Sequence, residues 1–163
     1  FHAAKLTGIF APMNATDHRI YKPEIRFGDI DAAGIVNNAV FLTYFEQSRI
    51  AYFAGLVGKN WDWHHAGMVV ARHEVNYRRP IPFGADATIY TWTQAVGTKS
   101  VTFAYEVWLH AAGQNHLSAE ARTTLVCFDH AAGHPIAVPE AWKAAMASEG
   151  FARPDHLMPQ KDV

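Results

Sequence analysis

The second half of the chain consists mainly of extended-strand patterns separated by short turn sequences. In "KSVTFAYEVWL" every second residue is apolar, as expected for a strand with one buried face: Val101, Phe103, Tyr105, Val107 and Leu109. The stretches "MVVARHEVNYRRP", "ATIYTWTQAV" and "LSAEARTTLVCFD" also have strand character. In the first of these, alternation predicts one shared face for Val69, Ala71, His73, Val75 and Tyr77. Consecutive strands with hairpin-length links pair antiparallel, so we predict an antiparallel sheet with at least three long strands.

One long helix is predicted before these strands. From Asn38 onward, side chains suited to burial recur at spacings of three and four on one helical face: Phe41, Tyr44, Phe45, Ser48, Tyr52 and Leu56. Asn37 or Asn38 is the predicted N-cap, and Gly55 and Gly58 are predicted stop signals. A short strand is predicted in "YKPEIRF" and a short helix in "PEAWKAAMA". The long helix must bury its stripe against the sheet, so the predicted fold class is α+β.

Length and composition favour one domain. The chain has 163 residues, half of them hydrophobic, and a formal net charge of −1. The balanced charge argues against nucleic acid or a membrane as partner, and no apolar stretch approaches the ~20 residues of a membrane span. The single cysteine, Cys127, fits a reducing compartment. We expect an N-terminal extension over residues 1–19 without a signal peptide, a domain over 20–149, and a loosely ordered tail over 150–163.

The stretch "FGDIDAAGIVNN", directly before the helix, holds the residues best suited to chemistry. A calcium loop that starts at Asp29 needs an oxygen ligand at its fifth position and a glutamate at its twelfth, but these are Ala33 and Val40. A phosphoryl-accepting aspartate usually lies at the edge of a doubly wound parallel sheet. The later part of this chain does not alternate strands with helices, so both hypotheses are disfavoured.

Two interpretations of the aspartates in "GDID" remain. In one, the unpaired N–H groups at the positive end of the helix bind a carbonyl oxygen. An upstream carboxylate then attacks the carbonyl carbon or activates water, and no metal is needed. In the other, Asp29 and Asp31 only cap the turn and the helix. The residues alone leave both open.

The stretch "RFGDIDAAGIVNNAVFLTYFEQSR" resembles the signature of hotdog-fold acyl-CoA thioesterases of the 4-hydroxybenzoyl-CoA thioesterase type. The resemblance continues through "VVARHEVNYRRPIPFGAD", "GTKSVTFAYEVW" and "ARTTLVCFD", and it extends from Ile20 to Lys143. It implies a hotdog fold, in which a curved antiparallel sheet wraps a long central helix. It also implies a homodimer, or a homotetramer made of two dimers, with active sites at the interface between two protomers.

The resemblance also implies roles for individual positions. Asp31 matches the catalytic aspartate, which acts as nucleophile or as general base toward water. Asn38 matches the residue whose backbone N–H polarises the thioester carbonyl, and Gly34 permits a close backbone approach. Many relatives carry a histidine where Ile35 stands, which leaves the side chains of Asn37 and Asn38 as polar helpers, with Asn37 expected to bind substrate.

The expected contacts to CoA lie farther along the chain. Thr98, Lys99 and Ser100, in "GTKS", fall where relatives contact the phosphates, and a lysine binds phosphate as a point charge. Arg78 and Arg79, in "YRRP", are similar candidates. The alternative for "GTKS" is a solvated hairpin tip.

The predicted function is therefore a cytoplasmic acyl-CoA thioesterase that releases a carboxylate and free CoA. No cofactor and no metal are expected, because the ten histidines form no H-E-x-x-H motif. One alternative is a hotdog module that binds acyl thioesters without catalysis. The other is a hydratase or dehydratase, which typically needs a histidine paired with a carboxylate near the helix. The acyl group, the choice between CoA and acyl carrier protein, and the choice between dimer and tetramer stay open.

Overall fold

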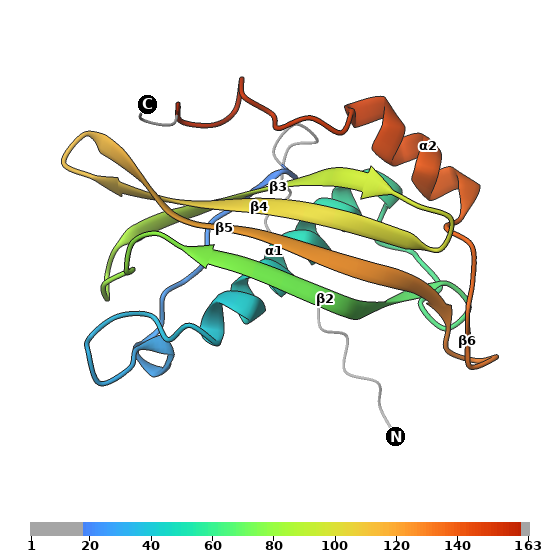
Figure 1. Cartoon of the computed structure of the whole chain (residues 1–163), viewed down its shortest axis with the longest axis horizontal. Coiled ribbons are helices and arrows are strands. Elements are labelled where there is room, and N and C mark those ends of the chain that lie inside the picture. Colours follow the sequence, from blue (N-terminus) through green and yellow to red (C-terminus); the bar gives the residue numbers. More distant parts are fainter. Residues whose placement is uncertain (1–17, 161–163) are drawn as a thin grey trace, which may run out of the picture.

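The computed structural model describes residues 18–160, so most of the predicted N-terminal extension lies outside the described residues. A six-stranded antiparallel sheet has the order β1-β3-β4-β5-β2, with β6 beside β5 (Figure 1). The strands are β1 (Ile20–Tyr21), β2 (Gly67–Tyr77), β3 (Asp86–Val96), β4 (Ser100–Ala111), β5 (Gln114–Asp129) and β6 (His134–Pro135). The helices are η1 (Phe27–Asp29), α1 (Val40–Val57) and α2 (Glu140–Glu149). The predicted α+β fold class is confirmed.

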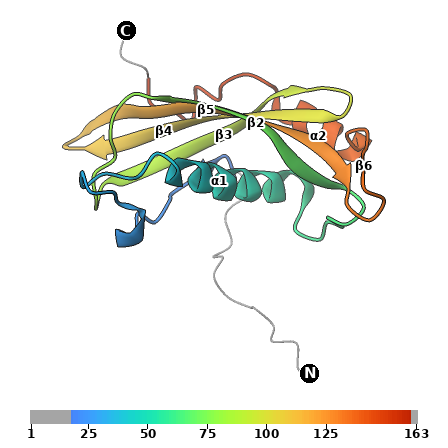
Figure 2. The ribbon, with the colours of Figure 1, turned by 60° about the horizontal axis from the view of Figure 1, so that its bottom comes forward.

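Helix α1 crosses one face of the sheet (Figure 2). Most of its predicted stripe is buried in the main core: Phe41, Tyr44, Phe45, Ser48 and Tyr52. The helix begins at Val40, two residues later than predicted, and it ends at Gly58, whose φ of 85° suits a glycine. Gly55 does not stop the helix. It lies inside α1 where a Cβ atom would collide with the ring of His18, so its lack of a side chain permits this packing.

The alternation predicted for β4 is confirmed, because all five inward residues are buried. The single face predicted for β2 is wrong. The pairing with β5 shifts between Val70 and Arg72, so that Val69 lies opposite Val126 but His73 lies opposite Thr123. Positions 126 and 123 of a strand point to opposite faces, and a β-bulge at Ala71 explains the change. Val69 therefore does not share a face with His73.

The strand predicted for "YKPEIRF" is mostly wrong. Only Ile20 and Tyr21 pair, with β3, and Phe27–Asp29 forms a short 3-10 helix. Pro23 has no N–H to donate to a neighbouring strand. The chain instead turns at Arg26, whose backbone N–H donates to the Asp29 carboxylate at 2.9 Å.

The C-terminal residues 150–160 lie on the sheet face opposite α1 (Figure 2). Met158 packs in a second, smaller core with Tyr90, Trp92, Ala104 and Trp108. Arg153 donates two hydrogen bonds of 2.9 Å to the buried carboxylate of Glu106. The expectation of a loosely ordered tail is therefore wrong for these residues, because a buried ion pair and apolar contacts fix them.

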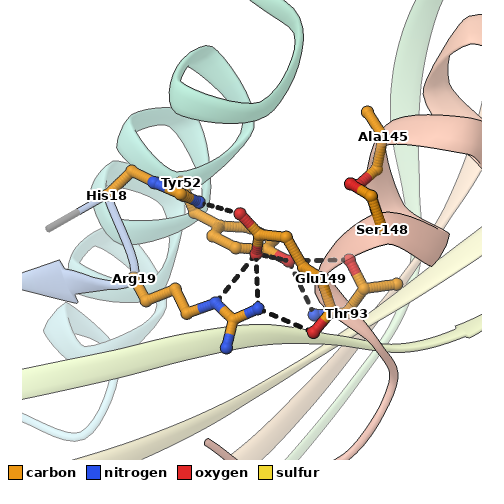
Figure 3. A network of polar contacts seen from close by, with 7 residues as sticks. All are labelled: His18, Arg19, Tyr52, Thr93, Ala145, Ser148 and Glu149. Carbon is orange, nitrogen blue, oxygen red and sulfur yellow. Dashed lines mark hydrogen bonds and ion pairs between the residues drawn. The ribbon is translucent and has the colours of Figure 1, made fainter. Parts of the chain in front are cut away.

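The start of the described chain is fixed to the end of α2 through Glu149 (Figure 3). The Glu149 carboxylate accepts hydrogen bonds from Arg19 at 2.8 Å and from Tyr52 at 3.3 Å, and it contacts the ring of His18. The Tyr52 hydroxyl also lies 3.0 Å from that of Thr93 on β3. Burial raises the pKa of Tyr52 to about 12, so this hydroxyl stays protonated at neutral pH. The network joins α1, α2, β3 and the segment before β1.

Among residues 18–160, no helix has the length and apolar character needed to cross a membrane.

Candidate active site

A cleft of about 310 Å³ opens at the N-terminal end of α1. Its walls combine apolar side chains, including Phe41 and Pro80, with polar ones. Asp31 and Asn38 come from the segment before the helix, whereas Tyr77, Arg78 and Arg79 come from the end of β2 and the residues after it. The fold thus brings two distant parts of the sequence to one site.

The turn that carries Asp31 has a fixed backbone. The Asp31 N–H donates to the Ile35 carbonyl at 2.9 Å, and the Gly34 N–H donates to the Asp31 carbonyl at 3.0 Å. Gly34 has a φ of 77°, which disfavours residues with a side chain. No atom lies within 4 Å of a Cβ built there, so within one protomer the backbone conformation, rather than a close contact, accounts for the glycine.

Asp29 braces this region from inside. Its carboxylate, 5% exposed, accepts hydrogen bonds from the Arg26 side chain at 3.1 Å and from the Tyr44 hydroxyl at 2.8 Å. Burial acts to raise the pKa of Asp29, but the hydrogen bonds from Arg26 and Tyr44 outweigh it and lower the pKa overall. These contacts give Asp29 a structural role in the segment before α1.

Asp31 has a different environment, half-buried in the cleft wall. Its Oδ1 atom accepts a hydrogen bond from the Ala33 N–H at 2.8 Å. Among residues 18–160, no donor binds its second carboxylate oxygen, Oδ2. One oxygen therefore holds the turn while the other is available to a ligand or to water.

The segment that leads into α1 contains a backbone N–H without an acceptor in the described part of the chain. Three hydrogen-bonding groups of Asn37 are engaged: its N–H with the Asp29 carbonyl, its Oδ1 with the Ala39 N–H, and its carbonyl with the Val40 N–H, each at 2.9 Å. Ala39, not an asparagine, occupies the N-cap position, although the Asn37 side chain satisfies one N–H there. The Asn38 N–H donates to no acceptor within the described part of the chain. It lies at the positive end of an 18-residue helix.

The predicted CoA contacts do not all meet in this cleft. Arg78 and Arg79 both line it and both are exposed, and the Arg78 guanidinium is paired with Glu120 at 2.9 Å. Thr98, Lys99 and Ser100 lie at the other end of the sheet. Ser100 pairs with Val126, which pairs with Val69, eight residues before Tyr77. At about 3.3 Å per residue, roughly 25 Å of strand separates the two ends.

No group of three or more potential metal ligands occurs among the described residues. Cys127 is fully buried, and burial raises the pKa of its thiol to about 11. The thiol is therefore protonated and inaccessible at neutral pH. Among the described residues that line the cleft, Asp31 alone carries a carboxylate.

Together these groups suit attack on a carbonyl. Asp31, with a free carboxylate oxygen, and Asn38, with a free backbone N–H, are both among the residues that line this cleft. The N–H can stabilise negative charge on a carbonyl oxygen while the carboxylate supplies a nucleophile or removes a proton from water.

Comparison with known proteins identifies the family to which this chain belongs. The family model described as "Thioesterase-like superfamily" matches residues 25–146, and the chain belongs to this family. The resemblance found in the sequence is thereby confirmed, as is its assignment to thioester-hydrolysing enzymes at the level of the family.

Two relatives and two solved structures show which proteins this chain resembles. A putative acyl-CoA thioesterase of Bacillus subtilis (strain 168), YneP, is 27% identical over 69% of this chain and 81% of its own. The long-chain acyl-CoA thioesterase FadM of Escherichia coli (strain K12) is 31% identical over 65% of this chain and 80% of its own. A Thermus thermophilus thioesterase, solved with coenzyme A and Zn, is 34% identical over 78% of this chain and 96% of its own, with a TM-score of 0.67. A 4-hydroxybenzoyl-CoA thioesterase structure, 18% identical over 78% of this chain and 97% of its own with a TM-score of 0.71, shows the shared fold.

Tyr77 is a site residue that the sequence did not reveal, since alternation placed it only on a strand face. Its hydroxyl donates to the Asn38 carbonyl at 2.9 Å, across 39 positions of sequence. The contacts of Arg26 and Tyr44 with Asp29 were not predicted either. The available signal for Tyr77 was weak: a tyrosine at the end of an alternating strand, directly before "RRP".

Proposed function

We propose that this protein is an acyl-CoA thioesterase with Asp31 and the Asn38 backbone N–H as its reacting site. The observation that carries the proposal is that one cleft is lined by Asp31, which has a free carboxylate oxygen, and by Asn38, which has a free backbone N–H. Membership of the thioesterase-like superfamily supports it. The names of YneP and FadM, and the coenzyme A bound by the Thermus thermophilus relative, support acyl-CoA as the substrate class.

The proposed reaction has two possible first steps, and each balances. If Asp31 is the nucleophile, its oxygen bonds to the acyl carbon, the C–S bond breaks, and water then hydrolyses the mixed anhydride. If Asp31 is the base, it takes a proton from water, the resulting hydroxide attacks, and the thiolate leaves. In both, the Asn38 N–H holds the oxyanion. CoA thiolate is a good leaving group, so no general acid is required.

A thiol-release screen tests the proposed function. Wild-type protein is incubated with acetyl-, hexanoyl-, decanoyl-, palmitoyl- and benzoyl-CoA, and free CoA is detected with a colorimetric thiol reagent. The buried Cys127 does not interfere in the folded protein. We expect catalytic thiol release from at least one substrate, and the preferred one identifies the acyl group. Release no faster than in protein-free buffer from the whole panel would contradict the proposal.

We further propose a homodimer formed through β2, with a homotetramer of two such dimers as its extension. Strand β2 is 11 residues long and is the last strand in the sheet order, so one of its edges is unpaired within the protomer. Val69 and Val70 on it are exposed to 37% and 44%. A long, apolar free edge is a template for pairing with another chain. Antiparallel pairing of two β2 strands brings one protomer's 98–100 turn toward the end of the sheet that holds its partner's Asp31 cleft.

Substitution of Val70 tests this interface. Val70→Lys places a charge on the unpaired strand, and we expect a shift from dimer to monomer in sedimentation analysis together with a loss of hydrolysis. Lys22→Ala removes a charge near the opposite edge strand, β1, and serves as the matched control. A Val70→Lys protein that stays dimeric would argue against the β2 interface.

Thr98, Lys99 and Ser100 remain the proposed phosphate contacts, contributed to the partner's cleft, with Arg78 and Asn37 nearer the thioester. Lys99 is exposed and makes only a long contact, 3.4 Å, with the Pro135 carbonyl. We expect Lys99→Ala to raise KM for acyl-CoA about 5- to 10-fold with kcat nearly unchanged, because a surface charge contact to phosphate adds about 1 kcal/mol of binding. An unchanged KM would contradict the contact.

A cytoplasmic location, expected from the sequence, fits the reduced state of Cys127.

A further inference from the structure

Tyr77 joins the end of the sheet to the start of α1. Its backbone is the last β2 position paired with β5, opposite Ala119. Its ring stands edge-on to Phe41, with centroids 5.1 Å apart and an interplanar angle of 88°. Its hydroxyl donates to the Asn38 carbonyl at 2.9 Å. The strand pairing and the ring contact with Phe41 both direct the side chain of Tyr77 toward Asn38, and 48% of its surface is exposed.

The helix itself does not bind the carbonyl that Tyr77 binds. In a regular α-helix the Asn38 carbonyl would accept the N–H four residues later, that of Leu42. Here the Leu42 N–H donates to the Ala39 carbonyl at 3.2 Å. Tyr77 supplies the donor that is missing, and this fixes the peptide group that follows Asn38.

The peptide group that precedes Asn38 is fixed from the other side. Its carbonyl belongs to Asn37 and accepts the Val40 N–H at 2.9 Å, while the Asn37 N–H donates to Asp29. The Asn38 N–H is part of this same planar peptide group, points away from the Asn37 carbonyl and has no acceptor within residues 18–160. Through the Cα atom of Asn38 it is joined to the peptide group that Tyr77 binds. The surrounding hydrogen bonds therefore set the direction in which this N–H points.

We infer that Tyr77 is a positioning residue for the oxyanion site, and that its hydroxyl acts through the Asn38 carbonyl. The inference rests on the proposed function. Oxyanion donors accelerate reactions because they are oriented before charge develops, so a donor with a looser support stabilises the transition state less. Without the Tyr77 hydroxyl, the Asn38 carbonyl exchanges a fixed partner for mobile water. The Asn38 N–H then points over a wider range of directions.

A role for Tyr77 as a general acid does not fit the same geometry. Its proton is directed at the Asn38 carbonyl, not into the cleft. Burial also raises the pKa of Tyr77, so the hydroxyl remains protonated and keeps its contact with Asn38 through the neutral range.

Tyr77→Phe tests the inference, because it removes the hydroxyl and keeps the ring on Phe41. We expect kcat on the best acyl-CoA of the panel to fall about tenfold with KM within about twofold, a smaller loss than the ~10²–10³ seen when an oxyanion donor is removed outright. Tyr21→Phe is the matched control. It removes a hydroxyl that donates to Gln47 at 2.6 Å on the surface, and both kinetic constants should stay unchanged.

A spectroscopic measurement separates positioning from a general loss of structure. The amide analogue of the best acyl-CoA, labelled with ¹³C at its carbonyl, is bound to wild-type and Tyr77→Phe protein. The carbonyl band should shift to lower frequency on binding to the wild type and less far in Tyr77→Phe. Unchanged kcat, or a reduced kcat with the same band position as wild type, would overturn the inference. A wild-type protein inactive on the whole panel would instead overturn the proposed function.

Discussion

Asp31→Asn is expected to lower kcat for acyl-CoA hydrolysis by roughly 10³-fold, because an amide neither attacks a thioester nor accepts a proton from water. The substitution keeps the shape of the side chain, and an amide oxygen can still accept the Ala33 N–H that Oδ1 now accepts. The turn should therefore persist, with Tm within a few degrees of wild type. Steady-state thiol release and thermal unfolding measure the two quantities.

Asp29→Asn is the matched control, since it makes the same chemical change two residues earlier. Asp29 is buried and bonded to Arg26 and Tyr44. We expect a clear loss of stability, with kcat reduced much less than in Asp31→Asn. Because folding lowers the pKa of Asp29 below 3.8, its carboxylate stabilises the wild type above that pH, and this contribution is lost as pH falls through the folded pKa. Full activity in Asp31→Asn would remove Asp31 from the mechanism.

The second large expected effect is a loss of stability on replacing Arg153, which lies in the C-terminal residues 150–160. Arg153→Met removes two hydrogen bonds from the Glu106 carboxylate, which is 3% exposed. Breaking a buried ion pair by removing one partner costs about 3 to 5 kcal/mol of unfolding free energy. For a chain of this size we therefore expect Tm to fall by roughly 6 to 20 °C. Chemical or thermal unfolding followed by circular dichroism measures the change.

Asp155→Asn provides the comparison for Arg153→Met. Asp155 also pairs with Arg153, but its side chain is 69% exposed. An exposed pair contributes at most about 1 kcal/mol, so Tm should change little. A similar loss in both variants would mean that the tail is held by its charges in general rather than by the buried carboxylate. Glu106 lies on β4 between Tyr105 and Val107, whose side chains are in the main core under α1, so its side chain points to the opposite face of the sheet. The kcat of folded Arg153→Met protein should therefore stay close to wild type.

The parts of the fold that the sequence predicts best depend on regular side-chain patterns. Strict alternation in 101–109 and the three–four spacing from Phe41 to Tyr52 are set by burial, and both correspond to buried faces. The β2 prediction fails because a bulge at Ala71 changes the strand face without a glycine or proline to mark it. The tail prediction fails because the stabilising interactions join residues far apart in the sequence: Arg153 bonds to Glu106, and Met158 belongs to one buried cluster with Trp92.

The candidate site likewise contains residues that the sequence predicts and residues that it does not. Asp31 and Asn38 lie within one short stretch whose local order is visible in the sequence, and they line one cleft. Tyr77 contacts Asn38 only because the end of β2 lies beside the start of α1, which no local pattern specifies. The wide separation of Lys99 from this cleft is equally a property of the sheet register. Because Lys99 lies far from the cleft of its own protomer, the predicted phosphate contacts require a second protomer.

The central claim is that the cleft at the start of α1 hydrolyses the thioester bond. The rival claims are that it binds the acyl thioester without reaction, or that it adds water to the acyl group and leaves the thioester intact. The most direct measurement is a product balance on the best acyl-CoA, with free CoA and carboxylate quantified by mass spectrometry over many turnovers. We predict equal amounts of both products from the wild type, well above one per protomer. Acyl-CoA that binds but stays intact, or that gains water with its thioester unbroken, would contradict the account.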